Sequence, residues 1–168
     1  MSSLVFVSVG TDHHPFDRLV RWADAWLPEG VQCVVQHGTS APPRRAEGVD
    51  YLDHGALTSL LDEAAVVVCH GGPTTITESR RHGRRPIVVP RSPALGEHVD
   101  DHQQRFCARM EAKGLISRTD DEDAFRALMD RALADPDEFA VPAHGGDVAE
   151  SVARFGDLVA DLLSARRA

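Results

Sequence analysis

The feature that most constrains the fold is a pair of apolar runs separated by a short helical segment in the middle of the chain. The first run, Ala65–Cys69, ends abruptly at His70-Gly71-Gly72, and Pro73 then opens the helical segment. Gly83 ends that segment, and a second apolar run, Pro86–Pro90, follows after it. Continuous apolar runs are typical of buried parallel strands, which need a crossover helix between them. This pattern therefore predicts a strand, a glycine turn, a helix and a parallel strand.

The same alternation extends over the whole chain of 168 residues. The expected strands are Leu4–Val9, Val31–Gln36, Val49–Leu52, Val66–Cys69, Ile87–Pro90 and Leu115–Arg118. The expected helices are Phe16–Leu27, Thr58–Ala64, Thr74–His82, Asp100–Lys113, Asp121–Ala134 and a terminal helix at about 147–165. Strands that alternate with helices predict a single α/β, Rossmann-like domain over residues 1–168, with a mostly parallel sheet of about six strands and helices on both faces.

Composition excludes several classes of function. The net charge of -8 argues against a general electrostatic affinity for nucleic acid or for an anionic membrane. No apolar run approaches the roughly 20 residues of a membrane span, and the first residues lack the basic region of a signal peptide. The three cysteines have no CxxC spacing, which favours reduced, buried thiols. A cytoplasmic protein without a direct membrane span is expected.

The start of the helix after Gly72 is a predicted anion site. The first N–H groups of a helix have no partner within it, and the positive end of the helix dipole points in the same direction. A proline at the first helical position loses nothing there, because its missing N–H would have been unpaired. Hydroxyls at Thr74 and Thr75 can add donors, and Glu78, one turn further on, is suited to accept hydrogen bonds from a ribose diol.

The order of residues in this segment resembles the donor-binding signature of the glycosyltransferase family 28 C-terminal domain, one half of the two-domain GT-B architecture. The matching positions are His70, Gly72, Thr74-Thr75, Glu78, Gly83, Pro86 and Asp101-His102-Gln103. Val7–Thr11 and Gln36-His37-Gly38 match the ends of the family's first two strands. The chain is most similar to single-domain members, namely the catalytic subunit of the split enzyme that extends dolichol-diphosphate-GlcNAc from UDP-GlcNAc, and bacterial exopolysaccharide transferase subunits.

The resemblance implies a role for each matching residue. His70 is the main catalytic candidate, with His13 and His14 as weaker ones in a loop that is rich in histidine. The residues implied to bind the nucleotide and its diphosphate are Gly10, Thr11, Gly71, Gly72, Thr74, Thr75 and Glu78. Those implied to bind the sugar are Asp101, His102 and Gln103, while Tyr51 and Leu52 are assigned to the uracil region.

The resemblance also implies the partners. The donor is a UDP-sugar, and a membrane-anchored protein subunit supplies the lipid-linked acceptor that this single domain has no room for. No metal and no other cofactor is expected, although His98 and His102 with Asp100 and Asp101 leave a metal cluster open as an alternative. A non-catalytic nucleotide-sugar-binding or regulatory module, and a nucleotide-sugar epimerase, remain as alternatives to a transferase.

Overall fold

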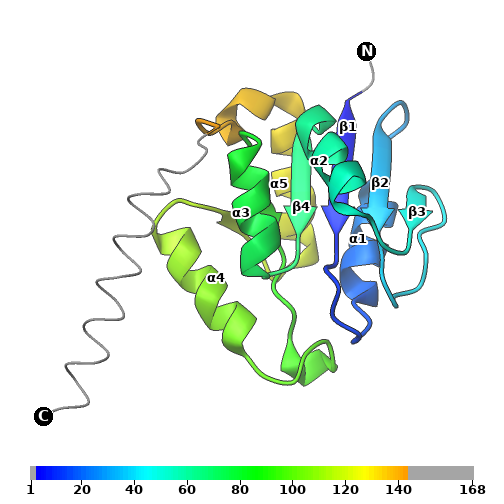
Figure 1. The fold of residues 1–168 in the computed structure, drawn as a ribbon, viewed down its shortest axis with the longest axis vertical. Helices are drawn as coiled ribbons and strands as arrows, with labels where there is room; N and C mark the ends of the chain where they lie inside the picture. The colour runs from blue at the N-terminus through cyan, green and yellow to red at the C-terminus, as the bar shows by residue number, and fades with distance from the viewer. Residues whose placement is uncertain (1–2, 144–168) are drawn as a thin grey trace, which may run out of the picture.

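A computed structural model describes residues 3–143, which form one parallel sheet flanked by helices (Figure 1). The strands are β1 (Leu4–Ser8), β2 (Gln32–Gln36), β3 (Glu47–Val49), β4 (Val66–Cys69), β5 (Ile87–Val88) and β6 (Ser117–Arg118). Their order in the sheet is β3-β2-β1-β4-β5-β6, and all neighbouring strands run parallel. The predicted six-stranded α/β fold is confirmed.

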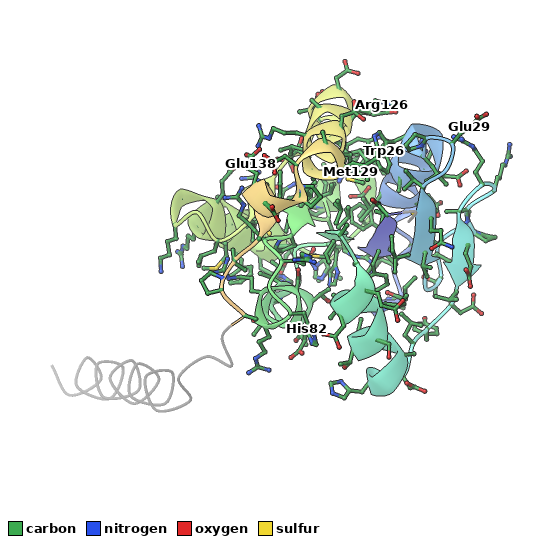
Figure 2. All side chains as sticks on the ribbon, turned by 90° about the horizontal axis from the view of Figure 1, so that it is seen from above. Trp26, Glu29, His82, Arg126, Met129 and Glu138 are labelled. Carbon is green, nitrogen blue, oxygen red and sulfur yellow. The ribbon has the colours of Figure 1, made fainter. Side chains whose placement is uncertain are left out.

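The helices cover both faces of this sheet, as the view from above shows (Figure 2). They are α1 (Asp17–Trp26), α2 (His54–Glu63), α3 (Pro73–Arg81), α4 (His102–Ala112) and α5 (Glu122–Ala134), with short 3₁₀ turns at Pro93–Leu95 and Pro136–Phe139. Trp26 of α1 and Met129 of α5 pack on one face, in the largest apolar cluster. Helix α2 packs on the other face against Phe6, and α3 and α4 share a smaller cluster around Cys69 and Cys107.

The strands contribute to both clusters because successive side chains of a strand point to opposite faces. Val5 and Val7 of β1 are fully buried on the side of α1 and α5, whereas Phe6 between them is fully buried against α2. A sheet that is covered on both faces needs continuous apolar runs rather than alternating ones. This is why the runs in the sequence identify the central strands correctly.

Several boundaries differ from the sequence-based expectation, those of α2 and β3 the most. Helix α2 begins at His54, four residues before the predicted Thr58, because the Asp53 carboxylate accepts a hydrogen bond from Ala56 N at 2.8 Å and caps the helix earlier. Strand β3 covers Glu47–Val49 rather than 49–52, because only these residues pair with β2. The predicted terminal helix at 147–165 lies outside the described residues.

None of the helices in the described part of the chain, residues 3–143, is both long and apolar enough to cross a membrane.

Candidate functional site

A cleft opens at the carboxyl edge of the sheet, where β1 and β4 lie side by side. The chain leaves β1 toward β2 on one side and, later, leaves β4 toward β5 on the other, so this is the point where the strand order reverses. Open parallel sheets bind ligands at such a point. The cavity there has a volume of ≈ 370 Å³. Its lining comprises Phe6, Ser8, Gly10, Thr11, Gln36, Tyr51, Leu52, Leu57, His70, Gly72, Pro73, Thr74 and Thr75.

The floor of the cleft is a glycine turn that follows β1. Gly10 has a φ of +80°, a conformation that side chains disfavour. Its N–H donates to the Ser8 hydroxyl at 3.2 Å, and its carbonyl accepts from Gln36 Nε2 at 3.1 Å. The Ser8 hydroxyl in turn donates to Gln36 Oε1 at 2.8 Å. These buried bonds fix the turn, which leaves Gly10 and Thr11 facing the cavity.

His70 stands at the end of β4, between the Gly10 turn and the start of α3. A Cβ atom added at Gly10 would lie 2.4 Å from His70 Cε1, and one added at Gly72 would lie 2.2 Å from Nε2. Both glycines are therefore required for the imidazole to sit where it does. His70 is 9% exposed, and its Nδ1 has no hydrogen-bond partner among the described residues. An unpaired buried polar atom is costly, which favours a ligand group at this position.

The charge state of His70 follows from its surroundings. Burial, together with the positive charge of Arg91, lowers the pKa of His70 from 6.5 to about 4. At neutral pH the imidazole is therefore uncharged, and it offers one N–H donor and one acceptor nitrogen. An anion bound beside it would favour the protonated form and raise this pKa.

The lowered pKa predicts that stability falls on mild acidification. Between pH 6.5 and 4 the unfolded chain protonates this histidine and the native one does not, so the free energy of unfolding falls as the pH falls. Relative to His70→Gln, which cannot titrate, the wild type is expected to lose about 3 kcal/mol over this window. Urea unfolding of both proteins at several pH values measures the difference. Parallel pH profiles would show that His70 titrates as an ordinary histidine.

The start of α3 forms one wall of the cleft. Gly72 is the N-cap residue and provides no side-chain cap, and Pro73 occupies the first turn. The N–H groups of Thr74 and Thr75 have no intrahelical acceptor, since they belong to the first turn of the helix. Both threonines line the cavity. The predicted anion site therefore has its backbone donors, hydroxyls and His70 within one cleft.

Of the remaining residues predicted to bind the nucleotide, Tyr51 and Leu52 line the cavity, whereas Glu78 and Gly71 do not. Tyr51, which is 54% exposed, and Leu52 line the cavity together with Leu57, and they form an apolar side suited to a base. Glu78 lies further along α3, outside the cavity lining, and its carboxylate accepts from Arg81 Nη1 at 2.8 Å. Gly71 packs beneath the cleft, where an added Cβ would lie 2.7 Å from Cys107 Sγ.

The three predicted sugar residues lie at the start of α4, outside the lining of the cavity. Asp101 is exposed and pairs with Arg105 at 3.1 Å, and His102 is half-exposed beside Asp100. Gln103 is buried, and its Oε1 accepts from Arg91 N at 3.2 Å. Gln103 therefore ties α4 to the segment after β5 in this structure, whereas Asp101 and His102 are accessible.

His13 and His14, the weaker catalytic candidates, occupy the loop between β1 and α1. His13 is exposed. The backbone N–H of His14 donates to Asp12 Oδ1 at 2.7 Å, and the ring nitrogen Nδ1 of His14 lies 2.6 Å from the same oxygen. Burial opposes ionisation of Asp12, but these bonds and the charge of Arg91 lower the pKa of its carboxyl to about 2. The Asp12 carboxylate therefore remains ionised and orients the His14 ring.

Arg91 supports the site although no sequence pattern marks it. Its side chain is fully buried after β5, and its guanidinium donates to three carbonyl oxygens: Val9 O at 2.6 Å, His14 O at 2.6 Å and Glu97 O at 3.0 Å. It thereby joins the loop after β1 to the loop before α4. The Glu97 carboxylate is held in turn by Arg18, at 2.8 Å.

Comparison with solved structures finds the same fold in part of several larger enzymes. The glycotransferase of kitacinnamycin is 20% identical with a TM-score of 0.60, and it matches 80% of this chain and 36% of its own. MurG of Acinetobacter baumannii is 16% identical with a TM-score of 0.57, over 83% of this chain and 43% of its own. The glycosyltransferase VinC, solved in complex with dTDP, is 20% identical with a TM-score of 0.54, over 80% of this chain and 34% of its own. The chain thus spans less than half the length of these proteins.

The sequence itself matches one family model, which covers most of the described residues. No curated protein sequence matches the chain. Residues 4–123 match the model of the glycosyltransferase family 28 C-terminal domain, a stretch that includes every predicted site residue. The resemblance deduced from the motif is confirmed at the level of the domain: the chain belongs to the glycosyltransferase family 28 C-terminal domain family.

Proposed function

We propose that the chain is the donor-binding subunit of a GT-B glycosyltransferase, which transfers a sugar from a nucleoside diphosphate sugar to an acceptor hydroxyl. The observation that carries this proposal is the cleft in which the start of α3, the Gly10 turn and His70 meet. Phosphate groups bind at helix starts of this kind. Donors already fixed in place also stabilise the negative charge that the leaving diphosphate gathers in the transition state.

The donor is proposed to be a UDP-sugar. Its diphosphate lies against Thr74, Thr75 and the neutral His70, and its base lies toward Tyr51 and Leu52. Glu78 is proposed to accept the ribose hydroxyls, which requires its carboxylate to turn from Arg81. The sugar extends toward the exposed Asp101 at the start of α4. Backbone amides, the helix dipole and the threonine hydroxyls are proposed to stabilise the diphosphate without a metal.

The acceptor is proposed to enter from a second polypeptide. The chain spans 34–43% of the three solved enzymes described above, so it corresponds to one of the two halves of a GT-B architecture. By the motif resemblance, that protein is a membrane-anchored subunit with a lipid-linked acceptor in exopolysaccharide or glycan synthesis. His14, oriented by Asp12, is the proposed base that takes the proton of the acceptor hydroxyl.

Nucleotide binding provides the direct test. Isothermal titration of the full chain with UDP is expected to show saturable binding, and Thr75→Val should weaken it about 10- to 100-fold, since one hydrogen bond to a charged group is lost. The matched control is Thr77→Val, because Thr77 is exposed on the next turn and does not line the cavity. The failure of both UDP and dTDP to bind, or equal losses in the two variants, would contradict the proposal.

Transfer is tested separately from binding. The isolated chain is expected to hydrolyse or transfer the donor sugar negligibly, and addition of the acceptor-binding subunit should restore turnover. Full transfer to a defined acceptor by the purified chain alone would contradict the two-subunit assignment. Tight UDP binding without transfer in the presence of that subunit would favour the non-catalytic binding module instead.

A further inference from the structure

We propose that His98, Asp100 and His102 form a binding site for a divalent transition-metal ion such as Zn²⁺, with the Asp12 carboxylate beside the far nitrogen of the His98 ring. The three ligands come from one five-residue stretch that leads into α4. One ligand atom from each lies within 4.8 Å of the other two. None of them lines the donor cleft, so this site is distinct from the diphosphate site.

The two histidine rings present the same nitrogen to one carboxylate. His98 Nδ1 lies 3.7 Å from Asp100 Oδ1, and His102 Nδ1 contacts the same oxygen directly. His98 Nδ1 also accepts a long bond, 3.4 Å, from Asp100 N, which fits a ring with its proton on Nε2. The lone pair of Nδ1 is then available to an ion. Two imidazole nitrogens and a carboxylate oxygen therefore lie close together, and an ion would replace the direct contact between His102 Nδ1 and Asp100 Oδ1.

This donor set suits Zn²⁺ in particular. Imidazole is a preferred ligand of zinc, nickel and copper, whereas calcium and magnesium prefer sites made entirely of oxygen. Two histidines and one carboxylate are a known set of protein ligands for zinc, and they leave a fourth position for water or another group. Asp100 and His102 are each about half-exposed, so an ion can reach them from solvent.

The carboxylate of Asp12, which is far from His98 in the sequence, lies close to the His98 ring. Asp12 Oδ2 lies 3.7 Å from His98 Nε2, on the side of the ring that faces away from Asp100. Histidines that bind metals usually donate their other N–H to a carboxylate, which fixes the ring and makes it a stronger ligand. The His98 side chain is only 10% exposed, so its orientation is already restricted. Arg91 connects the two loops that carry Asp12 and His98, through bonds to His14 O and Glu97 O.

A second group, Asp12, His13 and His14, is also close enough to share an ion. There the Asp12 carboxylate already bonds both the N–H and the ring of His14, so an ion would have to displace these contacts. In the stretch before α4 the Asp100 carboxylate likewise bonds both the N–H and the ring of His102, but His98 Nδ1 has only a long bond to lose, and the Asp12 carboxylate lies beside its other nitrogen. The geometry therefore favours His98, Asp100 and His102, and the other group becomes an outcome of the test.

Zinc binding to the full chain tests this inference. Titration with ZnCl₂ in a non-coordinating buffer is expected to show one saturable site. Loss of a residue that only hydrogen-bonds a metal ligand typically weakens metal binding about 10- to 100-fold. His102→Ala should weaken zinc binding by more than this, because it removes a direct ligand. His102 is half-exposed, so this variant should fold normally. The matched control is His82→Ala, since His82 also meets a carboxylate, that of Asp62, through Nδ1 at 2.6 Å but lies at the end of α3 (Figure 2).

Two further variants locate the ion. Asp12→Asn should weaken zinc binding about 10- to 100-fold, whereas His13→Ala should leave it unchanged. Co²⁺, used as a coloured substitute for Zn²⁺, should give the intense visible bands of a tetrahedral complex, and these should disappear in His102→Ala. Absence of saturable zinc binding, equal losses in His82→Ala and His102→Ala, or a loss in His13→Ala but not in His102→Ala would overturn the proposal. None of these readouts depends on nucleotide binding.

Discussion

Gly10→Ala is expected to destabilise the fold by about 2–5 kcal/mol, the sum of a strained backbone and a steric clash. Gly10 has a φ of +80°, so any side chain there is strained. The new Cβ would also lie 2.4 Å from His70 Cε1 and 2.5 Å from Nε2. Gly72 also approaches the ring, because a Cβ added there would lie 2.2 Å from Nε2. Urea unfolding monitored by circular dichroism measures the loss.

Gly30→Ala provides the matched control for this variant. Gly30 has a φ of +79°, and a Cβ added to it would meet nothing within 4 Å. It therefore carries only the strain of the left-handed backbone, about 1–2 kcal/mol, and the difference between the two variants measures the clash with His70. On a His70→Ala background, Gly10→Ala should cost no more than Gly30→Ala does. Equal destabilisation of Gly10→Ala and Gly30→Ala in the wild-type background would show that His70 does not occupy this space.

Much of the fold could be predicted because the signals are local. Continuous apolar runs mark β1 and β4, which are buried on both faces of the sheet, and a shorter run of Cys33, Val34 and Val35 marks β2. Glycines with positive φ follow helices at the positions expected, with Gly83 at +80° after α3 and Gly114 at +67° after α4. The start of α2 was placed too late, because Gly55 weakens the helical pattern directly after the Asp53 cap, although Leu57, Leu60 and Leu61 keep helical spacing.

The candidate site was predictable in part for the same reason. Gly72, Thr74 and Thr75 lie in one strand-turn-helix unit, so their convergence in a cleft follows from local geometry, and their proposed ligand remains to be tested. Gln103 belongs to the same motif but is buried against Arg91 N, a contact that depends on how α4 packs on β5. The role of Arg91 could not be predicted, because two of its three acceptors, Val9 O and His14 O, are distant in the sequence. These acceptors are also backbone carbonyls, which every residue has, so no residue type identifies them.

Arg91→Met is expected to destabilise the protein by about 3–5 kcal/mol, the range for breaking a buried polar network by removing one partner. Methionine nearly fills the space of the arginine stem but offers no donor, so Val9 O, His14 O and Glu97 O lose their bonds. Each buried carbonyl left without a partner costs about 1–3 kcal/mol. The contact of the guanidinium with the Phe16 ring, 4.9 Å from its centroid, is also lost.

Arg105→Met is the control for Arg91→Met. Arg105 is 70% exposed and makes one ion pair, with Asp101, so its removal should change the free energy of unfolding by about 0–1 kcal/mol. Arg91→Lys should lie closer to Arg91→Met than to the wild type, because a single ammonium cannot replace the planar guanidinium that joins three carbonyls. If urea unfolding finds Arg91→Met as stable as Arg105→Met, the guanidinium does not hold the two loops together. Asp12 and His98 would then have to be positioned for an ion by their own loops alone.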